Sequence, residues 1–81
     1  DFVKIAKNPF RTGTVLQYEL PDDCAYHLLL INALGQVVEK ITLPDRVGEL
    51  TLGEQLNSGV YFVQLCDDAA PLQTIKLLKI N

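Results

Sequence analysis

Apolar and polar residues alternate in short stretches of this chain, and turn residues separate the stretches. Leu16, Tyr18 and Leu20 alternate with polar residues over positions 14–20, and a Pro-Asp-Asp turn follows. A period of two places successive side chains on opposite faces of an extended strand. The pattern therefore predicts a half-buried β-strand rather than a helix, whose apolar residues would recur with a period of 3.6.

The same pattern recurs along the 81 residues and predicts seven strands, at residues 2–6, 14–20, 26–32, 36–42, 49–52, 60–66 and 73–80. No segment carries a helical period over ten residues, and residues 53–56 form one helical turn at most. Many short strands separated by turn signals are typical of antiparallel sandwiches. We predict an all-β fold, a seven-stranded immunoglobulin-like antiparallel β-sandwich that fills residues 1–81 as a single domain.

Three local features refine this prediction. Residues 26–32 are apolar on both faces near their centre, which favours a central strand covered on both sides. Gly35 follows Asn32-Ala33-Leu34 and predicts a hairpin turn, because glycine adopts positive φ without steric cost. Gly59 followed by Tyr61 is typical of a tyrosine corner, in which the hydroxyl bonds back to the preceding connection.

Composition excludes several classes of function. Seven basic residues against ten acidic ones give a net charge of −3, which argues against nucleic-acid binding. The longest apolar run covers residues 28–31 and is far shorter than the roughly 20 residues of a membrane-spanning helix.

Catalytic groups are sparse. His27 is the single histidine, and we expect a partly packed side chain at the rim of the sheet rather than half of a Cys-His dyad. Cys24 lies three residues before His27, which places the two side chains on opposite faces of a strand. The second cysteine, Cys66, is 42 residues from Cys24, and the spacing leaves a disulfide between them open.

Paired aspartates occur in two turns, at residues 22–23 and 67–68. Such residues usually cap backbone donors, although two pairs that met could hold a cation. Neither pair has the ligand spacing of a calcium loop. We predict no catalytic residue, no metal site and no cofactor.

The final predicted strand, residues 73–80, carries Lys76 and Lys79 among apolar residues. Lysines on an edge strand protect against aggregation, whereas an unpaired edge also accepts a strand from a partner. Both interpretations stay open at this point.

Four sequence blocks resemble one protein family. The blocks are Lys-Asn-Pro-Phe at residues 7–10 with Val-Leu-Gln-Tyr-Glu-Leu-Pro at 15–21, Leu-Ile-Asn-Ala-Leu-Gly-Gln-Val-Val at 30–38, Leu-Asn-Ser-Gly-Val-Tyr-Phe-Val-Gln-Leu at 56–65, and Lys-Leu-Leu-Lys-Ile-Asn at 76–81. In this order they resemble the type A C-terminal sorting domain of the type IX secretion system of Gram-negative bacteria. Ile31 stands where an aromatic residue is common in that family, and the two cysteines belong to no motif of it.

The resemblance implies a transport signal, cut from a larger secreted protein, that passes through the periplasm to the cell surface or the medium. Its implied partners are the outer-membrane translocon and a sortase-like protease that removes the domain and links the cargo to lipopolysaccharide. Recognition would fall on the closing block, and five residues would maintain the shape. The expected recognition residues are Lys76, Leu77, Leu78, Lys79, Ile80 and Asn81, and the shape residues are Asn8, Pro9, Gly35, Gly59 and Tyr61.

Other functions compete with this one. A retained immunoglobulin-like adhesion or accessory module, of a cell-surface protein or of the secretion machinery itself, fits the same fold. A small hydrolase does not, because no dyad is evident. Open edge strands also predict self-association, as a homodimer through strand pairing.

Overall fold

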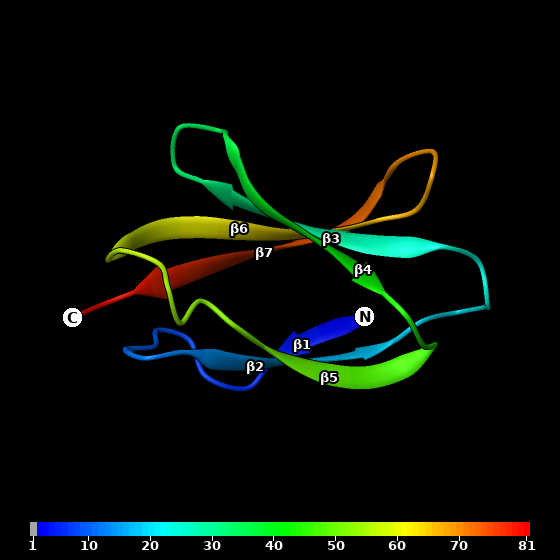
Figure 1. Ribbon diagram of the computed structural model, residues 1–81, viewed down its shortest axis with the longest axis horizontal. Helices are drawn as coiled ribbons and strands as arrows, with labels where there is room; N and C mark the ends of the chain where they lie inside the picture. Colours follow the sequence, from blue (N-terminus) through cyan, green and yellow to red (C-terminus); the bar gives the residue numbers. More distant parts are fainter. Residues whose placement is uncertain (1) are drawn as a thin grey trace.

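Two antiparallel sheets face each other in the computed structural model, which describes residues 2–81 (Figure 1). Seven strands build them: β1 (Val3–Ile5), β2 (Thr14–Glu19), β3 (Tyr26–Asn32), β4 (Val37–Leu43), β5 (Val47–Leu52), β6 (Gly59–Cys66) and β7 (Pro71–Lys79). No helix occurs among the described residues, so none there is long and apolar enough to cross a membrane. The predicted all-β sandwich with seven strands is confirmed.

The sheets contain three and four strands, in the orders β1-β2-β5 and β4-β3-β6-β7. β4 pairs with β3 through the hairpin between them, rather than joining β5 in the smaller sheet. Sandwiches of the immunoglobulin type differ in the placement of this fourth strand. Here its position leaves β4 and β7 as the two edges of the larger sheet.

β5 begins two residues earlier than the sequence predicts. Val47 pairs with Glu19, and Gly48 pairs with Tyr18. A glycine weakens a strand by itself, but the neighbouring strand supplies its backbone partners. The Tyr18 ring lies over Gly48, where an added Cβ would be 2.7 Å from the hydroxyl oxygen.

One face of each strand supplies the core. The predicted inward set of Leu16, Tyr18 and Leu20 is confirmed, since all three side chains are buried. They pack with the buried apolar residues of the other sheet. The largest fully buried side chains are Phe10, Leu16, Leu28, Leu30, Leu65 and Leu77.

The prediction that residues 26–32 are covered on both sides is wrong. Leu28 and Leu30 face the core and are fully buried, whereas Leu29 and Ile31 are half-buried. β3 does lie centrally, between β4 and β6, but only its inner face is covered by the second sheet. Apolar side chains on its outer face are therefore shielded by their strand neighbours alone.

The predicted tyrosine corner is present. The Tyr61 hydroxyl donates a hydrogen bond of 2.8 Å to the carbonyl of Asn57, four residues earlier. Gly59, between them, has φ of 152°, a value that residues with a Cβ rarely adopt. The bond anchors the β5–β6 connection to the start of β6.

The β3–β4 hairpin also follows the prediction. Gly35 has φ of 84°, and its amide donates to the Asn32 carbonyl. The Asn32 side-chain oxygen accepts bonds from the amides of Leu34 and Gln36. The asparagine thus organises a turn whose tip exposes Leu34.

Candidate recognition surface on the last strand

The closing block lies on the end of β7 and just beyond it, and alternation divides its six residues into two groups. Leu77 is 0% exposed and Lys79 is 6% exposed, so both point into the sandwich. Lys76, Leu78 and Asn81 are exposed, and Ile80 is half-buried. A receptor that reads the folded domain would contact the second group, because the first lies beneath the sheet.

Lys79 has a structural environment that the sequence did not reveal. Its ammonium group donates hydrogen bonds to the carbonyls of Gly53, at 2.6 Å, and Glu54, at 3.2 Å. The same nitrogen lies 5.9 Å from the centroid of the Phe10 ring, within range of a cation–π contact. The lysine that we expected on the surface therefore joins β7 to the β5–β6 connection.

The edge of β7 is occupied by the opening motif. Asn8 donates from Nδ2 to the Lys76 carbonyl, at 2.7 Å, and accepts at Oδ1 from the Leu78 amide, at 3.0 Å. Phe10 donates its amide to the Leu78 carbonyl and accepts from the Ile80 amide. An incoming strand would have to displace residues 8–10, so the expectation of an open edge is wrong over this part of β7.

Gln73 closes the same side of the molecule further along β7. Its Oε1 accepts from the amides of Phe2, at 2.8 Å, and Val3, at 3.1 Å, and its Nε2 donates to the Val3 carbonyl. The Gln73 side chain thus makes the backbone hydrogen bonds that a neighbouring strand would make, and it connects β1 to β7 across the two sheets. Gln73 was not among the predicted site residues, and its only signal in the sequence is a glutamine on the inward side of an edge strand.

Members of the opening, third and closing blocks meet at one end of the sandwich, where the carboxyl terminus lies (Figure 1). Arg11 donates to the carbonyl oxygen of Asn81, and the Asn81 side chain bonds Ser58 at 3.3 Å. Pro9, the remaining shape residue, follows Asn8 through a cis peptide bond and is exposed. Segments about 70 residues apart in sequence therefore form one continuous surface.

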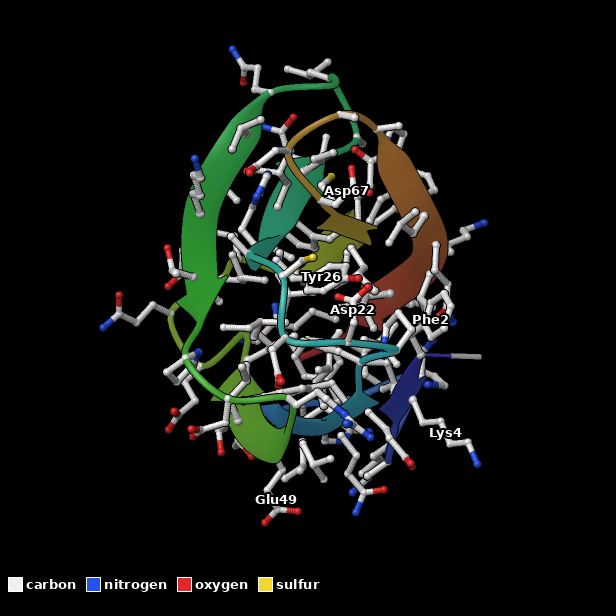
Figure 2. All side chains as sticks on the ribbon, turned by 90° about the vertical axis from the view of Figure 1, so that its right-hand side faces the viewer. Phe2, Lys4, Asp22, Tyr26, Glu49 and Asp67 are labelled. Atoms are coloured by element: carbon white, nitrogen blue, oxygen red, sulfur yellow. The ribbon has the colours of Figure 1, made fainter. Side chains whose placement is uncertain are left out.

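The two aspartate turns lie together at the opposite end (Figure 2). Asp22 accepts at Oδ1 from the Tyr26 hydroxyl, at 2.8 Å, and from the Cys24 amide. Asp67 accepts from the amides of Ala69 and Ala70. The predicted capping role of both turns is confirmed. Among residues 2–81, no group of three or more histidine, cysteine or acidic side chains is placed to hold a metal ion.

Hydrogen bonding dominates the electrostatics of this end. The bond from the Cys24 amide, followed by that from Tyr26, lowers the pKa of Asp22. The partner Tyr26 responds in the opposite direction, since its bond to Asp22 raises its pKa to about 12. The hydrogen bond thus stabilises Asp22 in its ionised form and Tyr26 in its neutral form.

The two cysteines are free thiols, Cys24 exposed and Cys66 buried. Cys66 is the strand partner of His27, a juxtaposition that the spacing did not predict. Burial, more than any other cause, raises the pKa of the Cys66 thiol. A nucleophilic cysteine requires the opposite shift, because the thiolate is the reactive form.

No family model matches the chain, and neither a curated protein nor a solved structure matches it.

Proposed function

We propose that this chain is a non-catalytic sorting signal that directs a cargo protein through the outer-membrane translocon of a type IX secretion system. The domain folds in the periplasm, where the secretion machinery recognises it. A sortase-like protease then removes it, and the cargo reaches the cell surface, by linkage to lipopolysaccharide, or the medium.

One observation carries the proposal: the opening and closing blocks of the resemblance lie side by side in space. Asn8 bonds both Lys76 and Leu78, and Phe10 pairs with the backbone of the same strand. Motifs that are distant in sequence but form one rigid surface suit a signal that is recognised after folding. Their shared surface, rather than a linear peptide, is the element we assign to the receptor.

The exposed residues of the closing block, with the half-buried Ile80, are the recognition residues on this proposal: Lys76, Leu78, Ile80 and Asn81. Leu77 and Lys79 act indirectly, because they hold the strand in place from inside. Deleting residues 76–81 would therefore remove part of the core as well as the signal.

A secretion assay tests the proposal without that complication. The 81 residues are fused to the carboxyl terminus of a periplasmic reporter, in a host with this pathway and in one whose translocon is disabled. We expect to find the reporter at the cell surface or in the medium only in the first host. The variant Lys76→Glu/Leu78→Asp should leave the reporter in the periplasm, whereas Lys4→Glu/Gln17→Asp, on the other sheet, should not.

The alternative is a retained adhesion or accessory module, which the uncovered apolar face of the larger sheet favours. A folded reporter fusion that stays in the periplasm of the competent host would contradict the sorting signal and support this alternative. Loss of export in the Lys4→Glu/Gln17→Asp control would show that the assay reports folding rather than recognition.

A further inference from the structure

The two outer faces of the sandwich differ in chemistry. On the three-stranded sheet, Lys4, Gln17 and Glu49 form one cross-strand row, and Glu19 and Thr51 belong to the same face. Figure 2 shows Lys4 and Glu49 pointing away from the molecule on this side. Val15 and Val47 share this face, but charged and polar side chains surround them, so it carries no continuous apolar stripe.

The outer face of the four-stranded sheet carries an apolar stripe between polar and basic residues. Its strand register places Val37, Ile31, Phe62 and Lys76 in one row, and Lys40, Leu29, Gln64 and Thr74 in the next. On β3, β6 and β7 these residues alternate with more deeply buried ones, so they point outward, and the strand pairing places Val37 and Lys40 of β4 on the same face. Val60 and Leu78 pair beyond the first row and extend the apolar area toward the carboxyl terminus.

Most of the exposed large apolar residues lie on the same sheet and its hairpin, and Val47, on β5 of the other sheet, is the exception at 60% exposed. Leu34 at the hairpin tip is 84% exposed, Val37 is 54% exposed and Leu78 is 38% exposed. Contiguous exposed apolar residues mark interaction sites more often than isolated ones. Ile31 and Phe62 connect them across the central strands.

Charge on this face is of one sign. Lys40 lies on the edge strand β4 and Lys76 on the opposite edge strand β7, and both are exposed. No carboxylate occurs among the outward-facing residues of these two rows, although the whole chain has a net charge of −3. A second copy of the face would bring lysines against lysines, so its charge is complementary to an acidic partner rather than to itself.

The width of the sheet limits the shape of the partner. Three strand spacings separate β4 from β7, which is about 14 Å. An α-helix with its side chains is about 10–12 Å across, so the two lysines flank the width of one helix. Covering an open sheet face with a helix is a common way to bury it.

We propose that the outer face of β4-β3-β6-β7 docks an amphipathic helix of another protein. The apolar stripe of that helix contacts Leu29, Ile31 and Phe62, and acidic residues on both sides of the stripe contact Lys40 and Lys76. This proposal does not depend on the secretion pathway, since an adhesion module would use the face in the same way.

Two synthetic 18-residue helical peptides test it, each with a leucine stripe, one flanked by glutamates and the other by lysines. Fluorescence anisotropy measures their binding to the 81-residue chain at low and at raised salt. We expect the glutamate peptide to bind, more weakly at raised salt, and the lysine peptide to bind at least tenfold more weakly. In NMR spectra, the backbone amides whose chemical shifts change on binding should belong to the two outward-facing rows.

Charge reversal supplies the decisive comparison. In Lys40→Glu/Lys76→Glu the affinity for the glutamate peptide should fall at least tenfold, and the affinity for the lysine peptide should rise. Lys4→Glu/Lys7→Glu makes the same change in net charge away from the face and should bind like the parent chain. Circular dichroism verifies that both variants are folded.

Several results would overturn the proposal. Equal binding of both peptides, no binding of either, or equal losses in the two double variants would each do so. Binding to phosphatidylglycerol vesicles but not to the glutamate peptide would assign the face to a lipid surface instead. A dimer in sedimentation that occupies the same amides would assign it to a second copy.

Discussion

The ammonium nitrogen of Lys79 lies 2.6 Å from the carbonyl oxygen of Gly53, inside the end of the sandwich. The lysine comes from the last strand, and the glycine begins the connection that leads to β6. A buried charge is tolerated only where hydrogen bonds replace its water. Here backbone carbonyls and the Phe10 ring provide that replacement.

Replacing Lys79 by methionine keeps most of the apolar stem but removes the charged donor. Hydrogen bonds to charged groups contribute about 1.5–3 kcal/mol, so we expect the free energy of unfolding to fall by roughly that amount. Urea denaturation measures it. Lys76→Met, on the exposed face of the same strand, should change the value by less than about 0.5 kcal/mol. Equal effects of the two substitutions would contradict the structural role of Lys79.

Gly53 and Gly35 form a matched pair for substitution by alanine, since φ is 83° and 84° respectively. At Gly35 an added Cβ meets nothing within 4 Å, but at Gly53 it would lie 2.6 Å from the Phe10 ring. Left-handed backbone alone costs about 1–2 kcal/mol. We expect Gly53→Ala to lose at least about 1 kcal/mol more than Gly35→Ala, because crowding costs about 1–3 kcal/mol. Thermal unfolding of both variants checks the difference.

Asn8→Ala removes the two side-chain bonds to the edge of β7. The Leu78 amide loses its acceptor, so its hydrogen exchange should accelerate relative to the Phe62 amide in the neighbouring strand. An uncovered edge also accepts strands from other copies. Sedimentation velocity should therefore show more self-association in this variant than in the parent chain. An unchanged exchange rate at Leu78 would show that Phe10 alone protects the edge.

The bond between Tyr26 and Asp22 predicts a pH dependence at both extremes. The folded pKa of Asp22 is below its ordinary value of 3.8, so its stabilisation is present above that value and is lost as pH falls through the folded pKa. Tyr26 has its pKa raised from 10.0 to about 12, so its contribution is present below pH 10 and is lost as pH rises through 12.

Asp22→Asn keeps an oxygen acceptor but removes the charge. We expect ultraviolet titration to show the pKa of Tyr26 moving back toward 10, and the acid limb of the stability profile to become shallower. Asp23→Asn, in the same turn, serves as the control and should leave both unchanged. A Tyr26 titration that stays near pH 12 in Asp22→Asn would contradict the assigned cause.

Tyr61→Phe removes a single oxygen atom and with it the bond to the Asn57 carbonyl. We expect a loss of about 0.5–1.5 kcal/mol, the usual net contribution of a hydrogen bond. Chemical denaturation provides the measurement. A change smaller than the error of that measurement would mean that water replaces the phenol at the carbonyl.

The local features of the fold were predictable because they depend on residues close in sequence. Alternation around Leu16 and Tyr18 determined a strand and its buried face, Gly35 determined a hairpin, and Gly59 with Tyr61 determined the corner. A strand has only two faces, so one buried residue determines the orientation of its neighbours.

The candidate surface was less predictable, because it depends on which strands meet. Parity on β7 indicates that Lys76 and Lys79 face opposite sides, but it does not say which side is covered. The facing sheet decides this, since it buries Leu77 on the same side as Lys79, and the Phe10 ring and the Gly53 turn then surround Lys79 itself. Asn8 likewise became an edge cap through contacts across 68 and 70 residues.

The sequence by itself determined seven strands, their turns and one buried side for the clearest of them, since period-two patterning and turn chemistry are local. The tertiary structure decided that β4 joins β3, that residues 8–10 cover the edge of β7, and that the outer face of the larger sheet stays apolar and uncovered. These outcomes depend on competition between distant segments for the same backbone groups and the same apolar surface. No local pattern encodes the result of that competition.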